Sequence, residues 1–390
     1  MSRPIINRTV WVLSLVSLFA DVASEMLYPV VPLYLKEIGF SLFLIGVLEG
    51  LAEFTAGLSK GYFGKRSDEL GLRLPFVKWG YFLSALSKPL MAVFTLPVWI
   101  FGVRTLDRLG KGLRTAARDA LLSEQATPAT KARVFGFHRS MDTLGAVLGP
   151  LLALFFLHVL PGQYRALFLW ALVPGLVAVA LIFLLREVRK PAASVSRGGF
   201  FSFFKYWNIA PAEYRKLVAG LLVFTLFNSS DVFLLVKAKA VTGSDTQTIL
   251  AYVGYNLLYA LLSYPLGALA DRMGLKRVFV GGLVVFGIVY LLFAQMESHA
   301  LLFVAFGLYA VYAAATEGIA KAWITNMAGG QDTGTAIGLY SSGQSICSLL
   351  ASSLTGLLWT LFNSAAAFYL IAFVALAVAV YLALFVRRFR

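Results

Sequence analysis

The chain has 390 residues, of which 59% are hydrophobic and 14% are charged, and its mean hydropathy is +0.79. A water-soluble domain of this size does not carry so much apolar surface, so we exclude a soluble globular protein. The single cysteine, Cys347, excludes both a disulfide framework and a multi-cysteine metal site.

Apolar stretches of about twenty residues recur along the chain, and each would cross a hydrocarbon layer about 30 Å thick as a helix. Lipid offers no hydrogen-bond partner to irregular backbone, so helices are required. The sequence predicts an all-α membrane protein with about twelve transmembrane helices. In chain order we expect them at Trp11–Leu33, Leu42–Phe63, Phe76–Phe94, Pro97–Arg118, Phe135–Leu157, Ala166–Leu185, Leu217–Val236, Thr248–Ala270, Val278–Phe293, Leu301–Ile324, Ala336–Leu358 and Ala366–Val386.

The first apolar stretch follows two arginines and superficially looks like a signal peptide. Asp21, Glu25 and two prolines interrupt it, and no small-residue cleavage site follows. We therefore expect a retained first helix. Pro29 and Pro32 are expected to bend this helix and to free backbone carbonyls that can line a cavity.

The net charge of +15 is explained by where the basic residues lie. Alternate loops and the tail hold Lys65, Arg66, Arg73, Lys131, Arg133, Arg186, Arg189, Lys190, Arg197, Lys205, Arg215, Lys216, Arg272, Lys276, Arg277, Arg387, Arg388 and Arg390. The opposite loops hold only Lys36, Arg165, Lys237 and Lys239. This asymmetry predicts a multi-pass protein with both termini cytoplasmic, and it explains the charge without a nucleic-acid partner. The membrane is expected to be a bacterial inner membrane.

A long polar interruption divides the predicted spans into two sets of six. We expect an N-terminal six-helix bundle at 1–186, a cytoplasmic linker at 187–216 and a C-terminal six-helix bundle at 217–390. Aromatic residues at 200, 201, 203, 204, 206 and 207 surround Lys205 and favour a short interfacial helix in the linker. A linker without such a helix is the alternative.

Two related loops indicate an internal repeat. Gly64-x3-Asp68-Glu69-Leu-Gly-Leu-Arg73 follows the second span, and Gly267-x3-Asp271-Arg272-Met-Gly-Leu-Lys-Arg follows the eighth. Asp107 and Lys111 of the fourth span recur in the tenth as an acid and a lysine four residues apart, Glu317 and Lys321.

These loops resemble the Gly-x3-Asp-Arg-x-Gly-x-Arg signature of the major facilitator superfamily, and the resemblance covers nearly the whole chain. The first copy departs from the signature by having Glu69 where the family usually has arginine. The resemblance implies the major facilitator fold, with two pseudo-symmetric six-helix bundles and a substrate site that opens alternately to each side. It also implies gating roles for four residues, Asp68, Arg73, Asp271 and Arg272. The alternative is that these residues have a purely structural role.

Charged residues inside the predicted spans are costly, so each is expected to be paired or functional. Asp21 and Glu25 lie one helical turn apart, as do Glu49 and Glu53. Neighbouring carboxyls in a low dielectric favour a bound proton, so we expect Asp21, Glu25 and Glu53 to carry protons. Glu49 is expected to line the substrate site.

The fourth span carries a polar stripe of Arg104, Asp107, Arg108 and Lys111. An Asp107–Lys111 pair is expected to cancel two charges, which leaves the two arginines to face the acids of the first two helices or an anionic substrate. Arg114 and Arg118 are expected to be interfacial anchors.

The fifth span contributes Arg139 and Asp142, which are expected to bind substrate or to form a structural pair. Gly145-x3-Gly149-Pro150 follows, and it resembles an element of the fifth helix in exporters of the superfamily that is associated with antiport. Tight helix packing is the other interpretation. In the second half, the residues expected at the substrate site are Asp231, Glu317 and Lys321.

The sequence favours a monomeric transporter that exports a small polar, zwitterionic or anionic molecule in exchange for protons and uses no cofactor or resident metal. Transport of a metal ion or metal chelate, or import by proton symport, is the alternative. A membrane enzyme is less favoured because no GxSxG elbow at a strand-to-helix turn, no HExxH helix and no Walker loop is evident. A receptor or lipid scramblase on the same fold is also less favoured.

Overall fold

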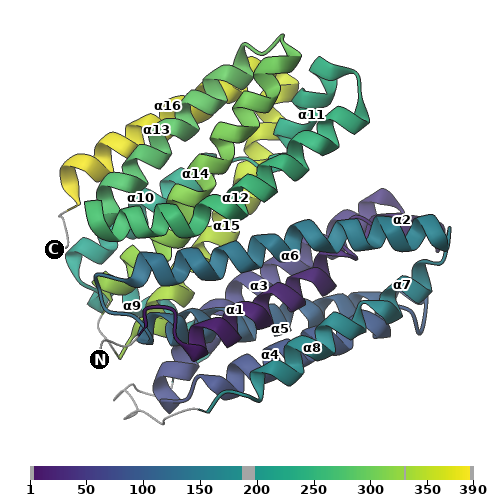
Figure 1. The fold of residues 1–390 in the computed structure, drawn as a ribbon, viewed down its shortest axis with the longest axis horizontal. Coiled ribbons are helices and arrows are strands. Elements are labelled where there is room, and N and C mark those ends of the chain that lie inside the picture. Colours follow the sequence, from purple (N-terminus) through teal and green to yellow (C-terminus); the bar gives the residue numbers. More distant parts are fainter. Residues whose placement is uncertain (1–3, 187–197, 329–330, 387–390) are drawn as a thin grey trace. The chain divides into compact units, whose positions relative to one another are not determined.

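The computed structural model describes residues 4–186, 198–328 and 331–386. Each predicted span falls on one helix or on two consecutive helices (Figure 1). Their bounds are α1 (Arg8–Glu25) with α2 (Val31–Glu37), α3 (Leu42–Leu70), α4 (Leu74–Leu90), α5 (Pro97–Glu124), α6 (Lys131–Val159), α7 (Tyr164–Trp170) with α8 (Leu172–Ile182), α10 (Ala212–Phe227) with α11 (Asp231–Thr242), α12 (Asp245–Met273), α13 (Leu275–Ala294), α14 (His299–Met327), α15 (Thr333–Leu361) and α16 (Ser364–Phe385).

Among the described residues, eight helical segments are long and apolar enough to cross a membrane. They are Lys131–Val159, Tyr164–Ile182, Ala212–Thr242, Leu250–Met273, Leu275–Ala294, His299–Met327, Thr333–Leu361 and Ser364–Phe385. The first four predicted spans fall outside this set. Among them, α4 has only 17 residues, and α1 and α5 carry several charges, most of which belong to the site described below.

Helix ends follow ordinary capping chemistry. The Asn7 side chain accepts a hydrogen bond from the Val10 amide at 3.0 Å, and Asn363 accepts one from the Ala366 amide at 2.8 Å. Gly71 ends α3 in a left-handed conformation, with φ of +63°, which a glycine adopts without steric cost.

Three predicted spans are interrupted in the structure, and the sixth is divided between α7 and α8 at Ala171. The first span stops at Glu25 and resumes at Val31, and Pro29 lies in the intervening turn, in agreement with the expected bend. The seventh is broken at Asn228–Ser230, which the sequence analysis read as continuous helix. Ser230 has extended backbone and caps α11 by accepting a hydrogen bond from the Val232 amide, so these polar residues start a new helix.

The chain divides into two compact units. Unit 1 comprises residues 1–125, 141–208 and 329–342, and unit 2 comprises residues 126–140, 209–328 and 343–390. The helices α6 and α15 therefore each contribute to both units. The bundle boundaries predicted at residues 186 and 217 stay a prediction.

Unit 1 is held together by contacts of α4 with α5 and α8, of α3 with α5, and of α1 with α8. Figure 1 shows α4 and α8 side by side. A buried apolar cluster lies where α1 and α2 meet α5 and α7, and it includes Met26, Tyr34, Ile100 and Phe168. This cluster seals one end of the polar pocket described below, because Phe168 belongs to both.

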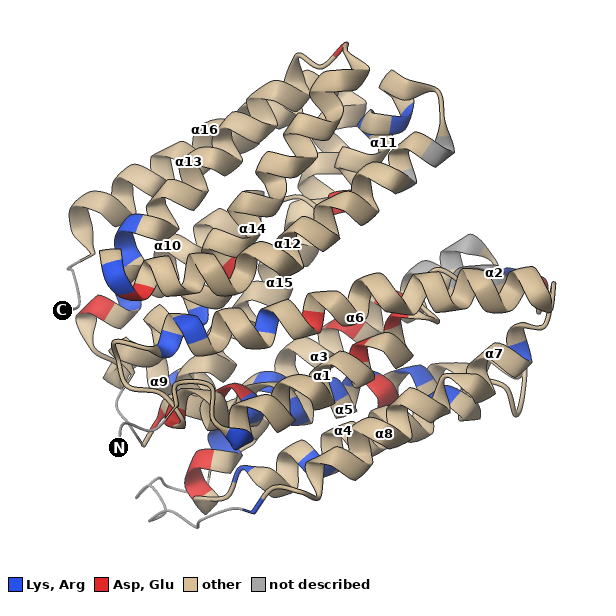
Figure 2. Ribbon diagram, viewed as in Figure 1, with Lys and Arg blue, Asp and Glu red and all other residues tan. Residues whose placement is uncertain are grey.

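Unit 2 packs α13 against α14 and α16, and α12 against α14. Its interior is aromatic: Phe286 lies 4.4 Å from Tyr290 and 4.6 Å from Tyr312 between ring centroids. Figure 2 shows the contrast between the units, since charged residues punctuate α3 and α5 whereas α16 is tan along its whole length.

The predicted linker helix is a 3-10 helix, η1 (Phe200–Lys205), followed by the short α9 (Tyr206–Ile209). Phe203 is fully buried against α3, whereas Phe201 is 61% exposed. The Lys65 ammonium donates a hydrogen bond to the Ser202 hydroxyl at 2.7 Å, which ties η1 to α3. Residues 187–197 of the predicted linker lie outside the described residues, and the membrane-surface position of η1 stays a prediction.

Candidate functional site

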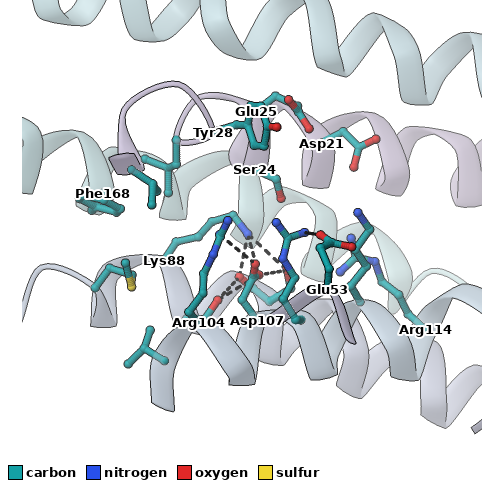
Figure 3. A pocket seen from close by; sticks show the side chains of 18 residues that line it. Asp21, Ser24, Glu25, Tyr28, Glu53, Lys88, Arg104, Asp107, Arg114 and Phe168 are labelled. Carbon is teal, nitrogen blue, oxygen red and sulfur yellow. Dashed lines mark hydrogen bonds and ion pairs between the residues drawn. The ribbon is translucent and has the colours of Figure 1, made fainter. Parts of the chain in front are cut away.

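A polar pocket with a volume of about 140 Å³ lies inside unit 1. Its walls come from α1, α3, α4, α5 and α7, and Figure 3 shows the acidic and basic side chains that extend into it. The charged residues that line it are Asp21, Glu25, Glu53, Lys88, Arg104, Asp107, Arg108, Lys111 and Arg114. The structure therefore brings together all three predicted proton carriers and the entire predicted stripe of the fourth span.

The α1 wall carries Asp21 and Glu25, as the spacing predicts. The Asp21 carboxyl shares a hydrogen bond with the Asp142 carboxyl of α6. Asp142 also accepts a hydrogen bond from the Ser17 hydroxyl at 2.8 Å. Two carboxyls can share such a bond only if one of them holds a proton. Asp142 is thus placed beside a predicted proton carrier, a position that the sequence analysis did not assign to it.

The α1 wall can approach α6 closely because α6 has glycines at the contact. A Cβ atom built on Gly145 would lie 3.0 Å from the Asp21 Cβ, and one built on Gly149 would lie 2.8 Å from the Glu25 Cβ. Pro150 follows inside the continuous helix α6. The packing interpretation of this motif is thus supported, and the antiport interpretation stays a proposal.

The arginines of α5 are paired with glutamates of α3. Arg104 donates from Nε and Nη2 to the two carboxylate oxygens of Glu49, both at 2.9 Å. Arg108 lies 3.3 Å from Glu53 and 3.8 Å from Glu49. The expectation that these arginines face acids of the second helix agrees with these contacts.

The expected Asp107–Lys111 pair is wrong. Asp107 accepts a hydrogen bond from the Ser84 hydroxyl at 2.6 Å and lies 3.7 Å from the Lys88 ammonium of α4 and 3.7 Å from Arg104. Lys88 is only 5% exposed and needs a counter-charge in the bundle, and it reaches Asp107 across the α4–α5 contact. Lys111 instead lines the pocket.

The expectation that Arg114 and Arg118 are interfacial anchors is also wrong, because they are only 4% and 7% exposed. Arg118 donates to the Ser17 hydroxyl at 2.9 Å and pairs with Asp119 at 2.9 Å. Arg114 lies over the Tyr81 ring, 4.4 Å from its centroid, and lines the pocket. Their spacing of three and seven residues from Lys111 continues the polar stripe and could have revealed this.

Three predicted substrate residues of the second half, and Arg139, lie in unit 2 and do not line this pocket. Arg139 lies 3.5 Å from Glu317 and stacks on Tyr259, 5.3 Å from its centroid. Asp231 accepts a hydrogen bond from the Tyr309 hydroxyl at 2.7 Å. Lys321 follows Glu317 by one turn of α14.

The predicted gate residue Asp68 lies at the end of α3 and is 3% exposed. Its carboxylate accepts hydrogen bonds from the Thr335 amide at 2.6 Å and the Gly334 amide at 3.2 Å, at the start of α15. It also forms an ion pair with Arg73, which pairs with Glu124 at 2.9 Å. Asp68 therefore caps α15 and uses Arg73 as its counter-charge.

Asp271, the equivalent residue of the second repeat, does the same at the start of α6. It accepts hydrogen bonds from the Ala132 and Arg133 amides, both at 3.0 Å, and lies 3.3 Å from the Arg133 guanidinium. Arg272 is exposed, and the cation that pairs with Asp271 is Arg133. The repeat in the sequence thus encodes a repeated helix cap.

Metal ligation was an alternative for the clustered acids. Within the described part of the chain, no group of three or more His, Cys, Asp or Glu side chains could hold a metal ion.

The sequence matches the model of the Major Facilitator Superfamily over residues 13–237 and again over residues 217–390. The chain belongs to the major facilitator superfamily. An uncharacterized MFS-type transporter of Methanocaldococcus jannaschii is 33% identical over 362 residues, which cover 91% of this major facilitator chain and 89% of the relative. The protein is therefore a transporter of this superfamily.

Two further proteins are similar to this major facilitator protein, one in sequence and one in structure. The multi-drug resistance efflux pump PmrA of Streptococcus pneumoniae is 30% identical over 142 residues, which cover 36% of this chain and 35% of that pump. The crystal structure of the human organic anion transporter MFSD10 has a TM-score of 0.83 at 18% identity and covers 97% of this chain and 100% of that one. The predicted fold class, a two-bundle major facilitator fold, is confirmed.

Proposed function

We propose that this protein is a secondary active transporter that exports a small polar, zwitterionic or anionic molecule in exchange for protons. One observation carries the proposal: the pocket of unit 1 combines two acids, Asp21 and Glu25, that form no ion pair among the described residues with a stripe of cations on the facing helix. Such a pocket can exchange a proton for an anionic group while the total buried charge changes little.

Asp21 and Glu25 are the proposed proton carriers. Among the described residues, neither forms an ion pair, and Asp21 shares its hydrogen bond with another carboxyl. Glu53 differs, because Arg108 lies 3.3 Å from its carboxylate. In this proposal Glu53 takes up a proton only when its ion pair opens.

The proposed substrate site is formed by the cations of α5 with Glu49 and Asp107. Binding of substrate and binding of protons favour different states of the transporter, and this difference is the only requirement for coupling. Arg139, Asp142, Asp231, Glu317 and Lys321 are proposed to serve the same transport cycle. Asp68 and Asp271 are proposed as gates, because a cap that joins two helices must break when those helices separate.

Export is supported by the likeness to PmrA, whose name describes an efflux pump, although that likeness covers about a third of each chain. The Gly149-Pro150 element also supports it. Import by symport would use the same groups, so direction must be measured.

The test is transport into inside-out proteoliposomes with an imposed pH gradient. Substrates are first found by thermal stabilisation of the purified protein, since a ligand raises the melting temperature by mass action. We expect accumulation that stops when an ionophore collapses the gradient. Accumulation that persists after collapse would exclude proton coupling.

A further inference from the structure

Arg114 is the buried guanidinium of the pocket that retains spare hydrogen-bond donors. It is 4% exposed, and among the described residues its Nε and Nη1 atoms have no hydrogen-bond acceptor. Its side chain lines the polar pocket together with Asp21 and Glu25 of α1, as Figure 3 shows.

Neighbouring cations have more hydrogen-bond and ion-pair partners than Arg114. Arg104 donates to both carboxylate oxygens of Glu49, Arg118 pairs with Asp119, and Lys88 donates to the Ser84 carbonyl at 2.8 Å beside Asp107. Arg108 keeps a spare Nε, but its Nη1 lies 3.3 Å from Glu53. Arg114 is therefore distinguished by two buried N–H donors that have no acceptor among the described residues, although the Asp21 carboxyl is an electrostatic neighbour.

The position of Arg114 is set by close helix packing and does not depend on a flexible side chain alone. A Cβ atom built on Gly80 would lie 2.6 Å from the Arg114 Cβ and 2.7 Å from the Gly110 carbonyl oxygen. This close approach of α4 brings Tyr81 under the guanidinium at 4.4 Å. The Tyr81 ring packs against the face of the guanidinium. It does not accept a hydrogen bond from the N–H groups, which point outward in the guanidinium plane.

A buried cation without an acceptor is costly, so an acceptor is expected at some stage of the protein's cycle. Asp21 does not serve in this state, because its carboxyl shares a hydrogen bond with Asp142 and no ion pair joins it to Arg114 among the described contacts. A ligand in the pocket can supply the acceptor, since the Arg114 side chain lines it.

A planar carboxylate matches the planar guanidinium, which can give it two parallel N–H bonds, one from Nη2 and one from either Nε or Nη1. We therefore infer that the substrate group is a carboxylate and that Arg114 is its binding residue. This inference rests on the proposed role of the pocket as the substrate site, which it deepens.

The test measures binding to the full-length protein purified in detergent, without any gradient. The probes are sodium benzoate, its neutral analogue benzamide, and inorganic phosphate, each at equal ionic strength. We expect benzoate to raise the melting temperature more than the other two. Arg114→Gln should weaken benzoate binding about tenfold or more, and Arg114→Lys should fold and bind with an intermediate affinity because it keeps the charge but loses the fork.

The matched control is Arg277→Gln, which removes an exposed arginine far along the chain and should leave benzoate binding unchanged. The proposal is overturned if benzoate fails to stabilise the wild-type protein, if phosphate replaces it as the preferred probe, or if both Arg114 variants bind benzoate like the wild type. Benzoate binding that is lost in Arg114→Gln, with no proton-driven flux in the wild type, would reject the transport proposal and keep this subsite.

Discussion

Asp107 accepts a hydrogen bond from Ser84 and lies 3.7 Å from Lys88, although Lys111 follows it by one turn of the same helix. Arg104 likewise finds Glu49 on another helix. At the scale of single residues, the charges of unit 1 are thus neutralised between helices. Each such pair stabilises the fold mainly because breaking it would leave a buried charge without a partner.

Removing Asp107 should therefore reveal how much free energy it costs to bury the Lys88 ammonium without a counter-charge. Asp107→Ala is expected to lower the free energy of unfolding by about 3 kcal/mol, since Lys88 would stay buried without a counter-charge. Adding Lys88→Met should restore most of that loss. The melting temperatures of both variants check this, and a double variant no more stable than Asp107→Ala would contradict the pairing.

Neutralising Asp21 should separate proton coupling from substrate binding. Asp21→Asn keeps the size of the side chain and removes its ionisation, so proton-driven flux is expected to fall about tenfold or more while substrate exchange at equilibrium persists. Glu297→Gln, which changes an exposed loop carboxylate, is the control. Equal driven flux in the two variants would remove Asp21 from the coupling mechanism.

At the scale of the helices, glycine placement decides how closely two helices approach. Gly149 lets α6 contact α1 beside Glu25, and Gly80 lets α4 contact α5 beside Arg114. The helix breaks act at the same scale, since the polar run Asn228–Ser230 ends α10 and places Asp231 at the first position of α11. Both devices position a charged side chain through the backbone.

Gly149→Ala should therefore be harmful although alanine favours helices. The new Cβ would lie 2.8 Å from the Glu25 Cβ and from the Met26 amide, so α1 must shift, at an expected cost of about 1–3 kcal/mol. Gly102→Ala in α5 has nothing within 4 Å and should be neutral or stabilising. Thermal melting of the pair checks this, and equal effects would contradict the packing.

At the scale of the whole molecule, two aspartates near helix C-termini, Asp68 in α3 and Asp271 in α12, repeat one device. Asp68 caps the start of α15 in unit 1, and Asp271 caps the start of α6 in unit 2. The superfamily match, which spans both halves of the chain, agrees with this repetition. Topology is the remaining expectation at this scale, because charge asymmetry alone places both termini in the cytoplasm.

The lone cysteine makes that topology easy to measure. In a Cys347→Ser background, a membrane-impermeant maleimide applied to intact cells should label Gln163→Cys and should spare Thr127→Cys, both at exposed loop positions. Permeabilised cells should show labelling of both variants, which controls for reactivity. The opposite pattern in intact cells would invert the predicted orientation.

The sequence by itself determined the approximate limits of the apolar spans, because hydropathy over about twenty residues is a local property, but it did not show that three of them are divided into two helices. It also predicted the family and part of the pocket, because helical spacing places a stripe such as Arg104 to Lys111 on one face. It did not predict that Arg114 joins this pocket or that Asp231, Glu317 and Lys321 lie outside it, in unit 2. Only the tertiary structure decided the partners: Lys88 for Asp107, Asp142 for Asp21, and none for the spare donors of Arg114. Partner choice depends on which helices meet and how closely, and residues far apart in the chain set that contact.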